Sequence, residues 1–292
     1  MTYGAAALAI AAAAVTAASA QPPTFKSGVS LVRLDVSVTH NRQPVRGLTA
    51  RDFKILDRGV AQRVESVTLG DELPVSVMMA LDISGSVDGV RLNHLIEAGR
   101  GLVNALRPTD RAALVTFSSE VRVPVPLTSE RPPILSALGD LKGRGATAVR
   151  DAVWAALNLR PDDDTRSMVL VFTDGLDTAS WLSASQLVTG AQRLGVVIHA
   201  IALGGGGPVT FVRGERQPPL LEALTDAAGG RQWSATSSRD LRELFTRAID
   251  EMRARYLVTF YPRGTPGAGW HELKVDASGR GEVRTRAGYF VD

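Results

Sequence analysis

Apolar residues recur with two different periods along the chain, and the change of period divides the sequence into a long central segment and two flanks. In residues 75–252, short continuous apolar runs such as 75–82 and 167–173 alternate with longer segments whose apolar residues have helical spacing. Continuous apolar runs are typical of strands buried on both faces of a parallel sheet. The pattern predicts an α/β fold with a doubly wound, mostly parallel, Rossmann-like sheet of about six strands. The run at 121–127 contains two prolines, so we expect it at a sheet edge.

The flanks, residues 25–70 and 255–292, show shorter runs in which apolar and polar residues alternate, as in LDVSV at 34–38. Such alternation is typical of strands with one buried face. Neither flank is long enough to bury a sheet on its own. We therefore expect the two flanks to meet in one small β-sandwich. Its expected strands include 53–57, 62–69, 255–261, 270–275 and 282–290.

The first 20 residues carry no charge, consist mainly of alanine and end in Ala18-Ser19-Ala20. They resemble a secretory signal peptide with its small-residue cleavage site, although the usual positive residues at the start are missing. We expect this segment to be cleaved and the protein to be secreted or to reside in the periplasm or cell envelope. The alternative is a retained alanine-rich anchor, because about 20 residues can just span a bilayer. We expect no membrane span in the mature chain.

The overall composition excludes several classes of function. The 33 basic and 30 acidic residues give a net charge of +3 without any long basic run, which indicates a mixed surface rather than nucleic-acid binding. Cysteine is absent. Disulfides, thiolate nucleophiles and sulfur-ligated metals are therefore excluded.

Side chains with oxygen atoms follow the ends of the apolar runs. Asp82, Ser84 and Ser86 occupy alternate positions after one run, Asp174 follows another, and Thr147 lies in a glycine-rich loop. The carboxyl ends of parallel strands share one edge of the sheet, where ligands bind in open α/β folds. Two carboxylates and three hydroxyls make an all-oxygen set that suits Mg²⁺, with Mn²⁺ or Ca²⁺ as alternatives. The lack of nitrogen and sulfur ligands disfavours zinc.

Three short motifs resemble the pieces of the metal-ion-dependent adhesion site, or MIDAS, of von Willebrand factor A domains. They are Asp-Ile-Ser-Gly-Ser at 82–86, Gly-Ala-Thr at 145–147 and Thr-Asp-Gly at 173–175, in the family's order and with similar spacing. The resemblance covers the central segment. The flanks, through 48–53 and 256–262, resemble those of a group of secreted bacterial proteins that carry such a domain.

The resemblance implies direct metal ligation by Ser84, Ser86 and Thr147, and ligation by Asp82 and Asp174 either directly or through water. Because only two of these ligands are charged, the ion is expected to keep a coordination position open for a Glu or Asp of an unidentified partner protein. The implied function is metal-dependent protein binding of the adhesion type, with no bond broken and no catalytic residues.

Each motif also has a simpler explanation. The serines and Asp82 could cap the following helix, and Thr147 could cap the helix that begins at 148. Asp151 matches the family's GxTAxxDA run, which implies a supporting role behind the ligands, but an aspartate in a first helical turn also interacts favourably with the helix dipole. Three independent caps rarely coincide with a complete set of motifs, so we favour the metal site.

Two other functions stay open, namely a hydrolase that uses the same cation to activate water and a structural domain with a vestigial metal site. Ile83 separates Asp82 from Ser84, so the Asp-Ser/Thr-Gly triplet of an aspartic protease is absent there. No G-x-S-x-G nucleophile motif occurs. Since no general base is evident beside the candidate ligands, we expect a binding module rather than an enzyme.

Overall fold

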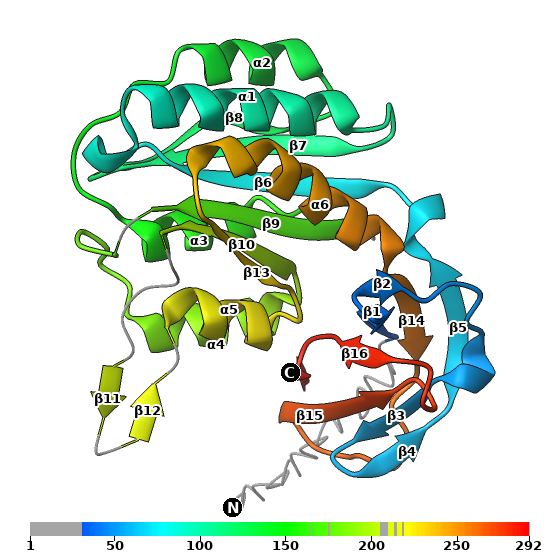
Figure 1. The fold of residues 1–292 in the computed structure, drawn as a ribbon. Coiled ribbons are helices and arrows are strands. Elements are labelled where there is room, and N and C mark those ends of the chain that lie inside the picture. The colour runs from blue at the N-terminus through cyan, green and yellow to red at the C-terminus, as the bar shows by residue number, and fades with distance from the viewer. Residues whose placement is uncertain are drawn as a thin grey trace, which may run out of the picture.

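The structure is a computed structural model that describes residues 31–163, 165–174, 176–204, 210–212, 215–217 and 219–291. The expected signal segment, residues 1–20, and Gly175 of the third motif lie outside the described residues. Figure 1 shows an α/β unit beside smaller antiparallel sheets that contain strands from both ends of the chain.

A six-stranded sheet forms the centre of the α/β unit, as the apolar runs predict. Its strands lie in the order β13 (Gln232–Ala235), β10 (Val197–Leu203), β9 (Arg166–Thr173), β6 (Val75–Asp82), β7 (Arg111–Phe117) and β8 (Val121–Thr128). Neighbouring strands are parallel except for β7 and β8. The proline-containing β8 is an edge strand, which confirms its expected position. The other edge strand, β13, is short, and no apolar run marks it in the sequence.

Helices cover both faces of this sheet (Figure 1). One face packs against α1 (Val90–Ala105), α2 (Arg131–Gly139) and α6 (Leu241–Ala254), and the other against α3 (Val149–Asn158), α4 (Ala184–Leu194) and α5 (Leu220–Ala227). All eight residues of β6 are buried between these layers, which accounts for its continuous apolar run. Strands β11 (Thr210–Val212) and β12 (Glu215–Gln217) pair as a separate hairpin.

The two flanks form two further antiparallel sheets. One contains β1 (Val32–His40), β2 (Gln43–Pro44), β5 (Val64–Leu69), β14 (Tyr256–Phe260) and β16 (Glu282–Arg284), and the other β3 (Lys54–Asp57), β4 (Val60–Gln62), β15 (Gly269–Asp276) and β17 (Gly288–Val291). Strands from the two ends of the chain pair directly, β1 with β14 and β3 with β15. One apolar cluster that includes Leu34, Ile55, Phe260 and Leu273 joins the two sheets.

Two expected strands of the flanks are each divided between different sheets. Residues 282–290 form β16 and β17, and the chain crosses between the sheets near Ala287, whose carbonyl accepts a 2.8 Å hydrogen bond from Leu273 N–H. A Cβ on Gly288 would lie 2.3 Å from the His271 carbonyl oxygen, so this crossing requires glycine. Residues 62–69 divide in the same way between β4 and β5.

Two buried arginines join the flank sheets to the α/β unit. Arg166, at the start of β9, contacts Asp35 Oδ1 at 2.6 Å and donates to the carbonyls of Gly70 and Met252. Arg255 is the single residue between α6 and β14, and its guanidinium donates to Glu251 and to the carbonyl of Gly229. Within the described residues, none of the helices combines the length and hydropathy needed to cross a membrane.

Candidate metal centre

The carboxyl edge of the central sheet brings four of the five sequence-predicted ligands into one hydrogen-bonded set. The hydroxyls of Ser84 and Ser86 lie 3.1 Å apart, and Ser86 Oγ donates to Asp174 Oδ1 at 2.7 Å. Asp82 Oδ1 accepts from the Ser84 backbone N–H at 2.8 Å. The parallel pairing of β6 with β9 places these strand ends side by side, so the arrangement follows from the sheet topology.

Thr147 reaches the same edge through its loop. Gly85 N–H donates to the Gly145 carbonyl at 3.1 Å, and Arg144 N–H donates to the Ile83 carbonyl at 2.8 Å. Gly145 has a φ of +84°, and a Cβ on it would lie 2.7 Å from Ser119 Oγ. The positive φ and the close approach of Ser119 therefore favour glycine at this position. The Thr147 hydroxyl makes no hydrogen bond to the other four candidates within the described residues.

Buried negative charge accumulates at this edge. The Asp82 side chain is buried, and its Oδ2 accepts from Thr173 Oγ1 at 2.6 Å. Burial raises the pKa of the Asp82 carboxyl and the charge of Asp174 adds to this effect, while hydrogen bonds from Thr173 and Ser84 partly offset it. Positive charge at this edge would relieve the repulsion between the two carboxylates.

Arg91, in the first turn of α1, supplies positive charge at the rim. Its Nη1 donates to Asp174 Oδ2 at 3.2 Å and to the Ser86 carbonyl at 3.0 Å. The Arg91 side chain is 54% exposed, whereas that of Asp174 is 3% exposed. The guanidinium therefore lies at the mouth of the set and the carboxylate at its base.

Helix capping does not explain the candidate side chains. Helix α1 has Gly89 as its N-cap and α3 has Ala148, and neither end has a side-chain cap hydrogen bond. Ser84 precedes a short 3₁₀ helix, Gly85–Val87, also without a side-chain cap bond. The hydroxyls of Ser84 and Ser86 instead contact each other, and Ser86 Oγ donates to Asp174.

Asp151 supports a loop rather than touching the other candidates. Its carboxylate accepts from Trp181 N–H at 2.9 Å and from Leu182 N–H at 3.0 Å. The loop also contacts Thr147, whose carbonyl accepts from the backbone N–H groups of Thr178 and Ala179. Asp151 thus contacts the candidate ligand Thr147 only indirectly, through the loop that both residues bind.

The donor set fits a hard cation. Among the described residues, no group of three or more His, Asp or Glu side chains is placed to hold a metal ion. A cation at this edge would therefore depend on serine and threonine hydroxyls together with Asp82 and Asp174, which is the all-oxygen chemistry that Mg²⁺ prefers. The sequence patterns did not single out Arg91, because it reaches the edge only through tertiary structure. Thr173 belongs to the third motif, but no contact with Asp82 was predicted for it.

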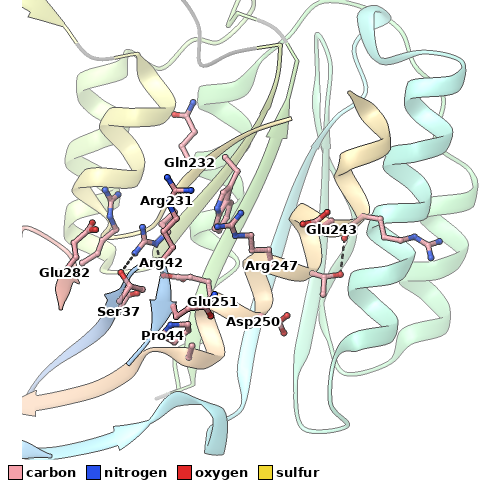
Figure 2. A pocket seen from close by; sticks show the side chains of 17 residues that line it. Ser37, Arg42, Pro44, Arg231, Gln232, Glu243, Arg247, Asp250, Glu251 and Glu282 are labelled. Carbon is pink, nitrogen blue, oxygen red and sulfur yellow. Dashed lines mark hydrogen bonds and ion pairs between the residues drawn. The ribbon is translucent and has the colours of Figure 1, made fainter. Parts of the chain in front are cut away.

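A cleft of about 920 Å³ lies elsewhere, at the junction between α6, β13 and the β1–β2 hairpin. Arg42, Arg231 and Glu251 lie along its walls (Figure 2). None of the five candidate ligands lines it. The cleft is therefore separate from the candidate metal centre.

Comparison with known proteins identifies the class of this fold. Residues 77–176 match the family model of the von Willebrand factor type A domain. That range includes all five candidate ligands. Residues 77–176 therefore resemble a von Willebrand factor type A domain, as the three motifs indicate.

Individual relatives are distant. A UPF0353 protein of Mycolicibacterium gilvum is 22% identical over 221 residues, which cover 68% of this chain and 64% of the relative. The match therefore spans a little under two thirds of that relative's own length. The inter-alpha-trypsin inhibitor heavy chain H2 of Sus scrofa is 22% identical over 161 residues, 48% of this chain and 17% of that protein.

Solved structures share the fold at low identity. The von Willebrand factor type A structure from Catenulispora acidiphila has a TM-score of 0.52 at 20% identity, covering 62% of this chain and 43% of that one. Proximal thread matrix protein 1 from the mussel byssus, solved with a zinc-occupied MIDAS motif, has a TM-score of 0.54 at 17% identity, covering 68% of this chain and 50% of that one. These likenesses show the fold.

Proposed function

We propose that this domain is a divalent-cation-dependent protein-binding module of the adhesion type. Its cation, Mg²⁺ or alternatively Mn²⁺ or Ca²⁺, would be held by Asp82, Ser84, Ser86, Thr147 and Asp174. The observation that carries the proposal is the continuous contact from Ser84 through Ser86 to Asp174 at the carboxyl edge. The hydroxyls are not used as helix caps there, so their convergence on a buried carboxylate needs another reason.

The chain's own residues define what the centre would accept. Asp82 and Asp174 bring two negative charges, and the other three donors are neutral, so a bound divalent ion would be balanced by these two carboxylates alone. When bound, the cation would supply an open coordination position that a Glu or Asp of a partner protein fills. Arg91 lies at the mouth of the set, where its exposed guanidinium would also favour an anionic partner group.

Catalysis is not part of the proposal. A hydrolase needs a general base near the reacting water. Three of the histidines are bonded elsewhere: His94 to Ser238, His199 to Glu251 and His271 to Asp57. The fourth, His40, ends β1 in the flank sheets. A binding module needs no such base.

The remaining parts of the proposal concern the whole chain. We propose that residues 75–252 act as the binding domain and that residues 25–70 and 255–292 form a β-sandwich that carries it. Export to the periplasm, cell envelope or medium, after cleavage of residues 1–20, completes the proposal. Mass spectrometry of the protein recovered from its producing cells would locate the mature N-terminus.

Thermal unfolding with and without Mg²⁺ tests the proposed centre. A ligand that binds only the folded state stabilises it by about 2.7 kcal/mol at a hundredfold excess over Kd. For a chain of this size we expect a rise in Tm of roughly 5–10 °C on replacing EDTA with saturating Mg²⁺. Asp174→Asn should abolish the rise.

The matched control is Asp163→Asn, which alters an aspartate near the other end of β9, where it pairs with Arg111. This variant should keep the full Mg²⁺ response. If the Tm of each of the three proteins is the same in Mg²⁺ as in EDTA, the proposed metal centre is wrong.

A further inference from the structure

The three most exposed large apolar side chains in the described part of the chain all belong to segments next to the candidate metal centre. Trp181 is 96% exposed, Val90 67% and Leu176 55%, whereas the next, Leu31, is 42% exposed. Leu176 lies two residues after Asp174, and Val90 directly precedes Arg91. Large exposed apolar side chains close to a candidate site are candidates for a partner-binding surface.

The loop that presents Trp181 is held firmly by hydrogen bonds. The Trp181 backbone N–H is bonded to Asp151, and the backbone of Thr178 and Ala179 is bonded to the Thr147 carbonyl. The exposure of the indole is therefore a property of an ordered loop.

A second aspartate fixes the base of the same loop. Asp177 accepts hydrogen bonds from Arg150 N–H, the Arg150 guanidinium and the Ser180 hydroxyl. Although burial opposes ionisation, these hydrogen bonds hold the pKa of Asp177 below its usual range. The carboxylate therefore stays charged and keeps the loop in place at neutral pH.

A preorganised, exposed tryptophan is typical of a binding hot spot. An indole offers about 150–250 Å² of contact surface, and it loses little conformational freedom when its backbone is already fixed. Tryptophan and arginine are among the residues most enriched at hot spots. Trp181 thus supplies an apolar anchor in the loop bonded to Asp151 and Thr147, and Arg91 supplies a positive anchor beside Asp174.

We infer that Trp181, with Leu176 and Val90, forms the apolar half of a composite docking surface, and that its partner is a protein segment that pairs an Asp or Glu with a large apolar or aromatic side chain. The acidic side chain would face Arg91 and the candidate centre, and the apolar one would pack on Trp181. This inference rests on the proposed function, because the centre is taken as the place where the acidic group binds.

Selection from a phage-displayed random peptide library tests the inference on the full chain. The library is bound in Mg²⁺ and eluted with EDTA. We expect the eluted peptides to contain an acidic residue near a large apolar or aromatic one. Measured with those peptides, Trp181→Ala should weaken binding roughly tenfold or more. Trp181→Phe should restore most of the affinity, because it keeps an aromatic surface.

Tyr261→Ala is the matched control, since Tyr261 is a 39% exposed aromatic residue that follows β14 in the flank sheets. It should leave peptide affinity unchanged. Equal Tm values for wild type and Trp181→Ala, expected from the exposure of Trp181, would show that a loss of binding is not a loss of folding.

Three different outcomes would contradict the inference, and each has its own result in these experiments. Peptides that are eluted by EDTA but need only an acidic residue, and that bind Trp181→Ala as tightly as wild type, would overturn the apolar half and leave the proposed function standing. If EDTA releases no peptide from wild type, the proposed function fails and this inference fails with it. If sedimentation shows that wild type forms dimers and Trp181→Ala is monomeric, the surface serves a second copy of the chain, and the inference is wrong.

Discussion

At the scale of single residues, the candidate centre depends on side chains whose positions are fixed by backbone contacts. Hydrogen bonds from the Ser84 N–H and the Thr173 hydroxyl hold the Asp82 carboxylate in place without an ion. The Gly85 N–H donates to the Gly145 carbonyl, so a backbone hydrogen bond joins the two loops. Such prior ordering reduces the entropy that a cation or a partner must overcome on binding.

Another residue-scale feature is a hairpin turn with an unusual side chain. The β1–β2 turn has positive φ at both central residues, 49° at Asn41 and 64° at Arg42. The β3–β4 turn has the same form, with 47° at Arg58 and 83° at Gly59. Turns of this type favour glycine at the second position, where Arg42 has a Cβ that disfavours the left-handed conformation.

Arg42→Gly should therefore stabilise the protein by about 0.5–1 kcal/mol. The substitution relieves the backbone strain of the folded state, and part of this gain is offset because glycine raises the conformational entropy of the unfolded chain. Gly59→Ala should destabilise it by about 1 kcal/mol, since a Cβ there meets no atom within 4 Å and only the positive φ opposes it. Urea unfolding measures both. Equal and same-signed changes would contradict the explanation from backbone strain.

The proximity of four candidate ligands could be predicted from sequence because they lie in short motifs at the ends of strands. Asp82, Ser84, Ser86 and Asp174 are brought together by the parallel pairing of β6 and β9, which the apolar runs predict. The position of Trp181 could not be predicted, because an apolar residue is normally expected to be buried. Its exposure depends on Asp151 and Asp177, whose partners are distant in sequence.

At the scale of elements, a buried ion pair joins Glu251 of α6 to Arg255, the residue between α6 and β14. Glu251 accepts from Arg255 at 2.9 Å, and the Arg255 side chain is fully buried. Burial opposes ionisation of Glu251, but the charge of Arg255 and the hydrogen bonds from Arg255 and His199 outweigh it and hold the pKa of Glu251 well below its ordinary value of 4.5. The pair therefore favours the folded state whenever Glu251 is ionised.

We predict that Glu251→Gln destabilises the fold at pH 7 by about 3–5 kcal/mol, because Arg255 is left buried without its counter-ion. A carboxyl whose folded pKa is depressed contributes stability above its unfolded pKa and loses that contribution as the pH falls through the folded value. The difference in unfolding free energy between wild type and Glu251→Gln should therefore shrink below about pH 4.5. Urea unfolding at several pH values measures it, and a constant difference from pH 7 to pH 3 would contradict the assigned role.

Two features at the scale of elements could not be predicted, because the pattern of apolar residues is weak in those segments. β13 has the sequence QWSA and is placed only by its pairing with β10. The division of residues 282–290 into β16 and β17 depends on the close approach of Gly288 to His271. Both features depend on contacts between distant parts of the chain, and the spacing of apolar residues along the sequence does not predict such contacts.

At the scale of the whole molecule, a one-residue connection and a buried arginine join the α/β unit to the flank sheets. Arg255 alone separates α6 from β14, and Arg166 bonds to residues of both parts. A Cβ on Gly70 would lie 2.0 Å from Arg166 Nη1 and 2.5 Å from the Arg255 carbonyl oxygen. The junction therefore leaves no room for a side chain at Gly70.

We expect calorimetry of the full chain to show one unfolding transition, and Gly70→Ala to lower its Tm while destabilising the fold by about 1–3 kcal/mol through overpacking. Gly47→Ala is a suitable comparison, since no atom lies within 4 Å of a Cβ there and only its positive φ would be strained. Two separate transitions in the wild-type scan would contradict this description of the junction.

The placement of β6 has a mechanical consequence. The strand begins at Val75, close to the flank sheets, and ends at Asp82, at the candidate centre. It is hydrogen-bonded along its length to β7 on one side and to β9 on the other. Tension between a captured partner and the flank sheets would run lengthwise along this strand and would have to shear both ladders together, rather than peel the hydrogen bonds apart one at a time.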